Sequence, residues 1–187
     1  MGFTASLHPL SLAGAVRASA LRTPQRIAVI EGERALTYAA LMAAARDGRS
    51  NASPVAQWLA AEMADESTGE NLRHRAMILR ALDNVVEHAA FDRDGASASS
   101  LPLDTEMGAV AATVSLLLGS TLHIVNLDGL ADGIGAGRFQ TCWLRSEEKS
   151  WKGLPRPAAA FRLALCVGMP SSELIQWLGE ERVAEAV

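Results

Sequence analysis

The sequence is poor in cysteine and has no long uninterrupted apolar run. It contains two cysteines in 187 residues, Cys142 and Cys166, and each lies inside a short apolar run that is typical of a strand. Such a pair is typical of free buried thiols rather than of a disulfide scaffold, and it predicts a reducing compartment, the cytoplasm. Pro9 interrupts the apolar residues near the N-terminus, which argues against a secretory signal or a membrane span.

Basic charge is also scarce. Lysine and arginine number 17 against 21 acidic residues, which gives a net charge of -4 and an isoelectric point near 5.6. Nucleic acids and anionic membranes both attract basic surfaces, so neither is an expected partner. The four histidines are not spaced as metal ligands, and no metal site is expected; they are His8, His74, His88 and His123.

What the chain does have is apolar patterning. Hydrophobic residues make up 49% of the sequence and charged residues 20%, a balance typical of a globular protein. A chain of this length buries a substantial core without a disulfide or a metal. We therefore predict a single domain over residues 1–187, with a possible internal joint at residues 46–54, the polar stretch "RDGRSNASP".

Strand-like and helix-like segments alternate along most of the sequence. The pattern predicts helices at residues 11–20, 39–45, 72–90, 105–118 and 173–186, and a helix or strand at 55–63. Strands are predicted at 27–30, 35–38, 120–125, 140–144 and 161–167, with a strand end at 99–103. This order predicts an α/β fold with a mainly parallel sheet, flanking helices and a small N-terminal β-hairpin.

Three segments allow more detailed predictions. Residues 72–90 predict an amphipathic helix, with one apolar face and Arg73, Arg80, Asn84 and Glu87 on another face. The apolar face consists of Leu72, Ala76, Leu79, Leu82, Val86 and Ala89. Residues 105–118 are apolar almost all round, which predicts a buried helix with Asp104 as its cap and Gly119 at its end. The glycines of "DGLADGIGAGRF" do not have dinucleotide-loop spacing, and this stretch is interpreted as a flexible connection.

Several stretches, in chain order, resemble one enzyme superfamily. They are "RTPQRIAVIEGERALTYAALMAAA", "STGENLRHRAM", "SLPLDTEMGAVAATVSLLLGSTLHIV" and, more loosely, "LALCVGMPSSELIQWL". Together they are similar to the N-terminal domain of the adenylate-forming (AMP-binding) superfamily, which includes acyl-CoA synthetases, nonribosomal adenylation domains and luciferases. The resemblance covers most of this chain but a minority of a typical member. It therefore implies a truncated relative.

The resemblance also identifies a degenerate phosphate loop. The family pattern is Thr/Ser-Ser-Gly-Ser/Thr-Thr-Gly-x-Pro-Lys-Gly, and Ser67, Thr68 and Gly69 match its centre. Asp65 and Glu66 stand near the leading small residues, and the Pro-Lys-Gly segment has no counterpart. Lost glycines restrict the backbone and a lost lysine removes positive charge, so phosphate binding is weakened. The resemblance thus implies a vestigial cofactor-binding site at these three residues.

Other family landmarks are altered or have no counterpart. Asp104-Thr105 replaces an aromatic-histidine pair near the acyl pocket, and the adenine and ribose motifs and the catalytic lysine are not found. We therefore expect a pseudoenzyme without catalytic residues or cofactor, acting as a binding or assembly partner through a homo-oligomer or another protein. Two alternatives stay open. One is a subunit of an AMP-forming carboxylate ligase that uses ATP and CoA once a second chain completes it, and the other is a non-catalytic binder of a small carboxylate, acyl or adenylate ligand.

Overall fold

A computed structural model describes residues 11–47, 53–68, 71–88, 90–92 and 94–186. The strands form one seven-stranded sheet in the order β2-β1-β4-β3-β5-β6-β7. Their bounds are β1 Ile27–Glu31, β2 Arg34–Thr37, β3 Ala96–Ser99, β4 Thr121–Ile124, β5 Thr141–Leu144, β6 Leu163–Cys166 and β7 Val183–Glu185. β1 and β2 pair as an antiparallel hairpin and every other pairing is parallel. The predicted α/β class, the mainly parallel sheet and the N-terminal hairpin are confirmed.

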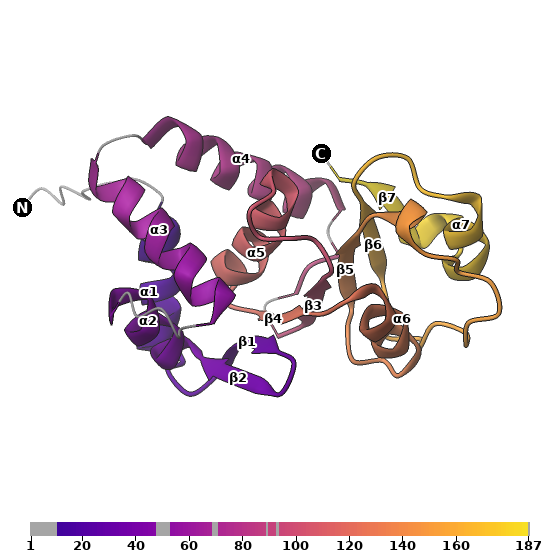
Figure 1. Ribbon diagram of the computed structural model, residues 1–187, viewed down its shortest axis with the longest axis horizontal. Coiled ribbons are helices and arrows are strands. Elements are labelled where there is room, and N and C mark those ends of the chain that lie inside the picture. The colour runs from indigo at the N-terminus through magenta and orange to yellow at the C-terminus, as the bar shows by residue number, and fades with distance from the viewer. Residues whose placement is uncertain (1–10, 48–52, 69–70, 89, 93, 187) are drawn as a thin grey trace, which may run out of the picture.

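Helices cover both faces of this sheet (Figure 1). They are α1 Leu12–Arg22, α2 Tyr38–Asp47, α3 Pro54–Thr68, α4 Asn71–His88, α5 Glu106–Leu118, α6 Leu127–Gly135 and α7 Ser172–Leu178. On one face, Val110 and Val114 of α5 belong to the same buried cluster as Trp143 and Leu165 of the sheet. On the other face, Leu130 of α6 and Leu174 of α7 pack in a cluster with Cys142 and Cys166. A third cluster joins α1, α2 and α3 to β1 and β4.

The buried helix α5 and its cap are each one residue later than predicted. Thr105, not Asp104, is the N-cap, and its hydroxyl oxygen accepts a hydrogen bond from the Gly108 amide at 3.1 Å. The same hydroxyl donates to the Pro102 carbonyl at 2.6 Å, which fixes the turn before the helix. A Cβ atom on Gly108 would lie 1.9 Å from that carbonyl oxygen, so a glycine is required there. Gly119 ends the helix with φ of 75°, as predicted.

The glycine-rich stretch at 128–139 is not the flexible connection that we expected. Most of it lies in α6, whose N-cap Asn126 accepts a hydrogen bond from the Gly129 amide at 2.8 Å. Leu127, Leu130, Ala131 and Ile134 recur at helical spacing, and the last three are buried. A Cβ on Gly133 would lie 1.9 Å from the Phe139 ring, so that glycine allows the ring to pack directly on the helix backbone.

The predicted helix at 173–186 is wrong over its second half. α7 begins as expected, with Ser171 as N-cap, but it ends at Leu178 because Gly179 adopts φ of 94°. A short 3-10 turn at Glu180–Arg182 and the edge strand β7 follow. Val183 and Ala184 pair with β6, and the strand pairing offsets the loss of helix. The terminal segment is therefore part of the sheet.

The first half of the chain differs from expectation mainly in α3. The segment predicted as a helix or strand over 55–63 is a helix that continues to Thr68. The possible joint at 46–54 falls mostly on residues 48–52, which lie outside the described residues. Directly before α3, the Ser53 hydroxyl oxygen accepts a hydrogen bond from the Ala56 amide at 3.0 Å.

Helix α4 is the predicted amphipathic helix, but the face that it buries is not the predicted apolar face. Ile78, Ala81 and Asn84 are buried, although Asn84 was predicted on a polar face. The Asn84 amide nitrogen donates to the Arg80 carbonyl at 2.9 Å. Leu79 and Val86, from the predicted apolar face, are 60% and 80% exposed. The side chains of Leu72, Arg73 and Ala89 lie outside the described part of the chain.

Candidate functional site

Two places in the molecule are candidates for a ligand site. In open α/β sheets ligands bind outside the carboxyl ends of the strands, where the strand order reverses. Here β4 lies on one side of β3 and β5 on the other, so the reversal falls at β3 and β5. The second candidate is the junction of α3 and α4, where the sequence places the vestigial phosphate loop.

The segment after β3 is closed by hydrogen bonds within the protein. The Ser100 amide donates to the Trp143 carbonyl at 3.1 Å. The Leu101 amide donates to the Ser99 hydroxyl oxygen at 3.2 Å. Ser99 and Leu101 are both buried. The backbone at this end of the strand is therefore tied to the neighbouring strand rather than directed toward a ligand.

The segment after β5 is held in the same way. The Ser146 hydroxyl oxygen accepts from the Ser171 amide at 2.8 Å, which ties the loop after β5 to the loop after β6. The buried Trp151 donates its indole N–H to the Ser146 carbonyl at 2.8 Å. Trp151 also stacks on Trp177 with ring centroids 5.3 Å apart. These tryptophans anchor the loop after β5.

At the second candidate, the predicted site residues are part of a helix. Ser67 and Thr68 are the last two residues of α3, and Gly69 lies outside the described residues. α4 begins at Asn71, two positions after Gly69. The last turn of a helix presents carbonyl oxygens and the negative end of the helix dipole. This polarity is the opposite of that at a helix N-terminus, where phosphate binds.

The buried thiols are poor nucleophiles. Both cysteines are free and buried, as the sequence predicts. Burial is the main cause that raises the pKa of the Cys166 thiol to about 12, with a smaller contribution from Glu147. Burial, followed by Cys166, raises the pKa of Cys142 as well. Because the thiolate is the reactive form, neither side chain is suited to nucleophilic catalysis near neutral pH.

His123 lies in β4, as predicted, and contacts Phe139 edge-on with ring centroids 4.8 Å apart. Burial and then the positive charge of Arg138 lower the pKa of His123. No acidic partner is described beside it in the part of the chain that the structure covers, and its surroundings are those of a packed ring.

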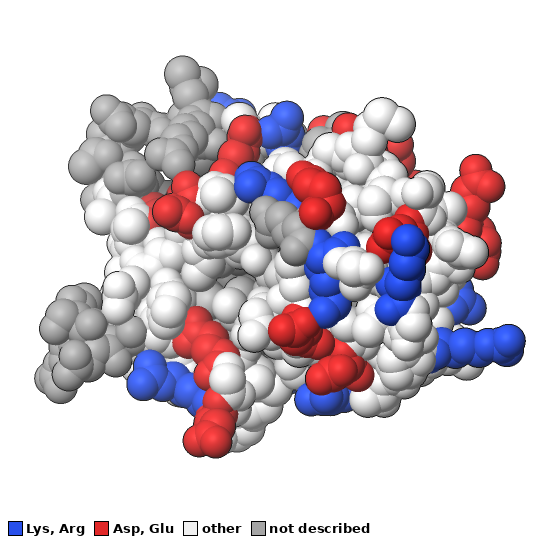
Figure 2. Space-filling model, turned by 45° about the vertical axis from the view of Figure 1, so that its right-hand side comes forward, with Lys and Arg blue, Asp and Glu red and all other residues white. Residues whose placement is uncertain are grey.

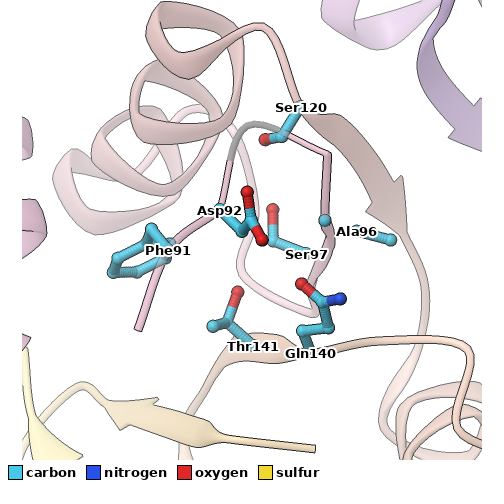
Figure 3. A pocket seen from close by; sticks show the side chains of 8 residues that line it. Phe91, Asp92, Ala96, Ser97, Ser120, Gln140 and Thr141 are labelled. Atoms are coloured by element: carbon cyan, nitrogen blue, oxygen red, sulfur yellow. The ribbon is translucent and has the colours of Figure 1, made fainter. Parts of the chain in front are cut away.

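A small hollow lies at the opposite, amino-terminal edge of the sheet (Figure 3). Its lining comes from the starts of β3 and β5 and from the segments before β3, β4 and β5: Phe91, Asp92, Gly95, Ala96, Ser97, Ser120, Gln140 and Thr141. Several oxygen atoms point into it, but it leaves no room for a water molecule. The Ser97 and Ser115 hydroxyls are hydrogen-bonded to each other. The hollow is a packing gap rather than a binding site.

Charge and metal ligands do not mark another site. Figure 2 shows acidic and basic side chains interspersed over the face that it draws, without a wide area of one sign. Among the residues that the structure covers, no group of three or more histidine, cysteine or acidic side chains is placed to hold a metal ion. Within the same ranges, no helix is both long and apolar enough to cross a membrane.

Comparison of the sequence with known proteins finds no matching family model and no matching curated protein. Comparison of the fold is more informative. O-succinylbenzoate coenzyme A synthetase (MenE) from Bacillus subtilis, in complex with ATP and magnesium, aligns with 89% of this chain at a TM-score of 0.65 and 13% identity. MbtA from Mycobacterium smegmatis aligns with 93% of the chain at a TM-score of 0.65 and 11% identity. VinN in complex with L-aspartate aligns with 89% at a TM-score of 0.63 and 10% identity.

The chain has the fold of the adenylate-forming enzymes. This agrees with the resemblance that the colinear sequence stretches indicate. The aligned region makes up 57% of the MenE chain, 56% of MbtA and 72% of VinN. At these identities the likeness concerns the adenylate-forming fold alone, and the activities of the three enzymes are properties of those proteins.

Sequence reasoning missed two features around the candidate sites. The first is α6, whose signal was present in the Asn126 cap and in the helical spacing of Leu127, Leu130 and Ile134. The second is the orientation of α4, which carries apolar residues on two opposite faces. Periodicity identifies both faces as apolar but does not determine which one the rest of the protein covers.

Proposed function

We propose that this protein uses the adenylate-forming fold as a binding or assembly partner and does not itself form adenylates. The observation that carries the proposal is the course of the chain at the vestigial phosphate loop. α3 runs as a helix through Ser67 and Thr68, and α4 begins at Asn71. Only two residues separate α3 from α4 in the sequence, which is fewer than the family's glycine-rich loop contains.

Electrostatics at this junction disfavour a nucleotide further. Asp65 and Glu66 fall in the last turn of α3, next to the negative end of its dipole. A carboxylate 4 to 8 Å from a phosphate adds repulsion of about 1 kcal/mol even in a high-dielectric setting. The lysine that supplies positive charge in the family's loop has no counterpart between Thr68 and Asn71. The polyphosphate of ATP is therefore repelled at the point where catalysis requires it to be held.

The reversal point of the sheet supports the same conclusion. Hydrogen bonds within the protein use the amides of Ser100, Leu101 and Ser171, and the buried Trp151 donates to the Ser146 carbonyl within the loop after β5. Opening this edge for an adenylate would break these bonds and expose a buried indole. Such a rearrangement has a substantial cost, because each buried polar group left unpaired costs about 1 to 3 kcal/mol.

The test is exchange of radiolabelled pyrophosphate into ATP, with a panel of carboxylic acids that includes o-succinylbenzoate and L-aspartate. MenE from Bacillus subtilis serves as the positive control in the same buffer. The proposal predicts no exchange above the enzyme-free background for any acid. Acid-dependent exchange by the purified chain would overturn it.

The ligase-subunit alternative is tested by the same assay on the complex that the tagged chain retains from its native source. Exchange that arises only in that complex, and in neither component alone, would replace the proposal with the two-chain enzyme. A retained complex without exchange supports the assembly role.

A further inference from the structure

Side chains attach the middle of the segment between β5 and β6 to the rest of the protein. We call this middle part, residues 150–157, the strap; it lies at the end of the molecule that carries α7 (Figure 1). Among the described residues, no backbone–backbone hydrogen bond joins the strap to the rest of the chain. Such bonds resume at Ala158, whose amide donates to the Ile134 carbonyl at 3.1 Å. Pro155 and Pro157 contribute to this pattern, because proline has no N–H to donate.

One carboxylate on α7 binds the beginning of the strap. Glu173 accepts hydrogen bonds from the Ser150 hydroxyl at 3.0 Å and from the Trp151 amide at 3.2 Å. It also pairs with the Lys152 ammonium at 3.1 Å. These donors, with Lys152 as the largest cause, lower the pKa of Glu173, so its carboxylate is ionised near neutral pH. Because hydrogen bonds to an ionised acceptor are stronger than neutral ones, this one side chain supplies three strong contacts to consecutive residues.

The same side of α7 binds the rest of the strap. Trp177 lies four residues after Glu173, which places the two side chains on one side of the helix. The Trp177 indole N–H donates to the Pro155 carbonyl at 2.7 Å, and its ring stacks on that of Trp151. Another side of α7 is buried in the core through Leu174 and Leu178. α7 is thus fixed to the sheet by one side and contacts the strap with another.

The contacts of the strap differ from those of the strands on either side of it. All the residues of β5 and β6 are buried, and the two strands pair along their length. In the strap, the side chains of Glu173 and Lys152 are 32% and 75% exposed, so water can replace their partners when the strap moves away. Segments with few backbone hydrogen bonds and few buried apolar contacts open locally at a lower free energy than the core.

We propose that the strap opens and closes as one unit while the sheet stays folded, and that Glu173 is the latch that keeps it closed. Opening separates Trp151 from Trp177 and breaks the bond from the Trp151 indole to the Ser146 carbonyl. Trp151 is 1% exposed in the closed form, so opening uncovers an aromatic surface that the closed form hides. The moving segment ends at Ala158, where backbone hydrogen bonds resume.

The experiment is hydrogen exchange of the full chain, followed by NMR near neutral pH. The reporter is the Trp177 indole proton, which is bonded to Pro155 and not to Glu173. In the wild type it should exchange faster than the amides of β5 and β6. Glu173→Ala should accelerate its exchange by about tenfold or more, because bonds to a charged acceptor are lost. Glu173→Gln, which keeps one acceptor oxygen, should accelerate it less.

The matched control is Glu180→Ala, an exposed acid in the turn after α7, which should leave the indole exchange unchanged. The Gly179 amide, bonded to the Ile175 carbonyl at 2.8 Å, reports on α7 and should also keep its rate in Glu173→Ala. Indole exchange that is unchanged in Glu173→Ala would overturn the proposal. Equal acceleration of the β5 and β6 amides would overturn it too, since the strap would then open only with the sheet. Equal acceleration of the Gly179 amide would assign the effect to unfolding of α7 instead of the strap.

Discussion

Helices α4 and α5 are neighbours in the fold, and their surroundings are very different. α5 is buried along most of its length, and its apolar residues meet the sheet on one side and α4 on the other. α4 has apolar residues on two faces, of which the structure covers one. The difference shows that apolar positions in a sequence indicate which side chains favour burial. The position of the helix in the fold determines which of these side chains are buried. α5 lies between α4 and the sheet and is buried, whereas α4 lies at the margin and leaves Leu79 and Val86 exposed.

The largest contrast is expected between Val114→Asp in α5 and Val86→Asp in α4. Val114 is fully buried, and an unpaired carboxylate there should destabilise the protein by about 4 kcal/mol or more. Val86 is 80% exposed, so the same change should alter the free energy of unfolding by less than about 0.5 kcal/mol. Urea unfolding followed by circular dichroism measures both. Equal losses would mean that Val86 is covered within one chain, against the comparison.

A second contrast lies within α4 itself. Asn84 is buried and donates to the Arg80 carbonyl, whereas the adjacent Asp83 is exposed. Asn84→Ala removes that bond and leaves a gap, and we expect a loss of about 1 to 3 kcal/mol in stability. Asp83→Ala, the matched control, should change the monomer's stability by less than about 0.5 kcal/mol. Urea midpoints of the two variants measure this difference.

The start of α5 supplies a smaller effect. Thr105→Ala removes the N-cap oxygen that accepts from the Gly108 amide, which should cost about 1 kcal/mol in the free energy of unfolding. Asp104→Ala should cost little, because Asp104 precedes the cap and is exposed. Chemical denaturation of the two variants compares them directly. A larger loss of stability from the Asp104 substitution would show that Asp104 is the cap, as predicted from the sequence.

The smallest expected effect is a pH dependence on the other face of the sheet. Burial and Arg138 lower the pKa of His123 in the folded state below its ordinary value near 6.5. The unfolded state therefore binds the proton first, and stability should fall as the pH decreases from about 7.5 to 5.5. His123→Gln should flatten that slope in urea midpoints measured across this range. A slope that is unchanged in the variant would show that another group causes it.

Local signals in the sequence account for much of the fold. The hairpin turn, the order of β3, α5 and β4, and the Gly119 helix end follow from nearby residues and are observed. The edge strand β7 was missed because its residues suit a helix and its strand conformation depends on pairing with β6, a contact that no local pattern contains. The same reason explains why the sequence does not determine which face of α4 is covered.

The candidate site illustrates a second limit. The resemblance located Ser67, Thr68 and Gly69 within the family's phosphate-loop region, but a matching string of residues does not specify a loop conformation. α3 continues through the first two of them, since nothing in "AAEMADEST" stops a helix before Thr68. The hydrogen bond that ties the loop after β5 to the loop after β6 joins Ser146 to Ser171, which are 25 residues apart, and no local pattern contains such a contact.

The central claim is that the junction of α3 and α4 no longer binds nucleotide phosphate. The most direct measurement is titration of isotope-labelled protein with MgATP up to millimolar concentration, following the backbone amide signals of residues 64–72 by NMR. The account predicts that these signals move no more than those of surface residues elsewhere. Saturable shifts confined to these amides, and reproduced by pyrophosphate, would contradict it.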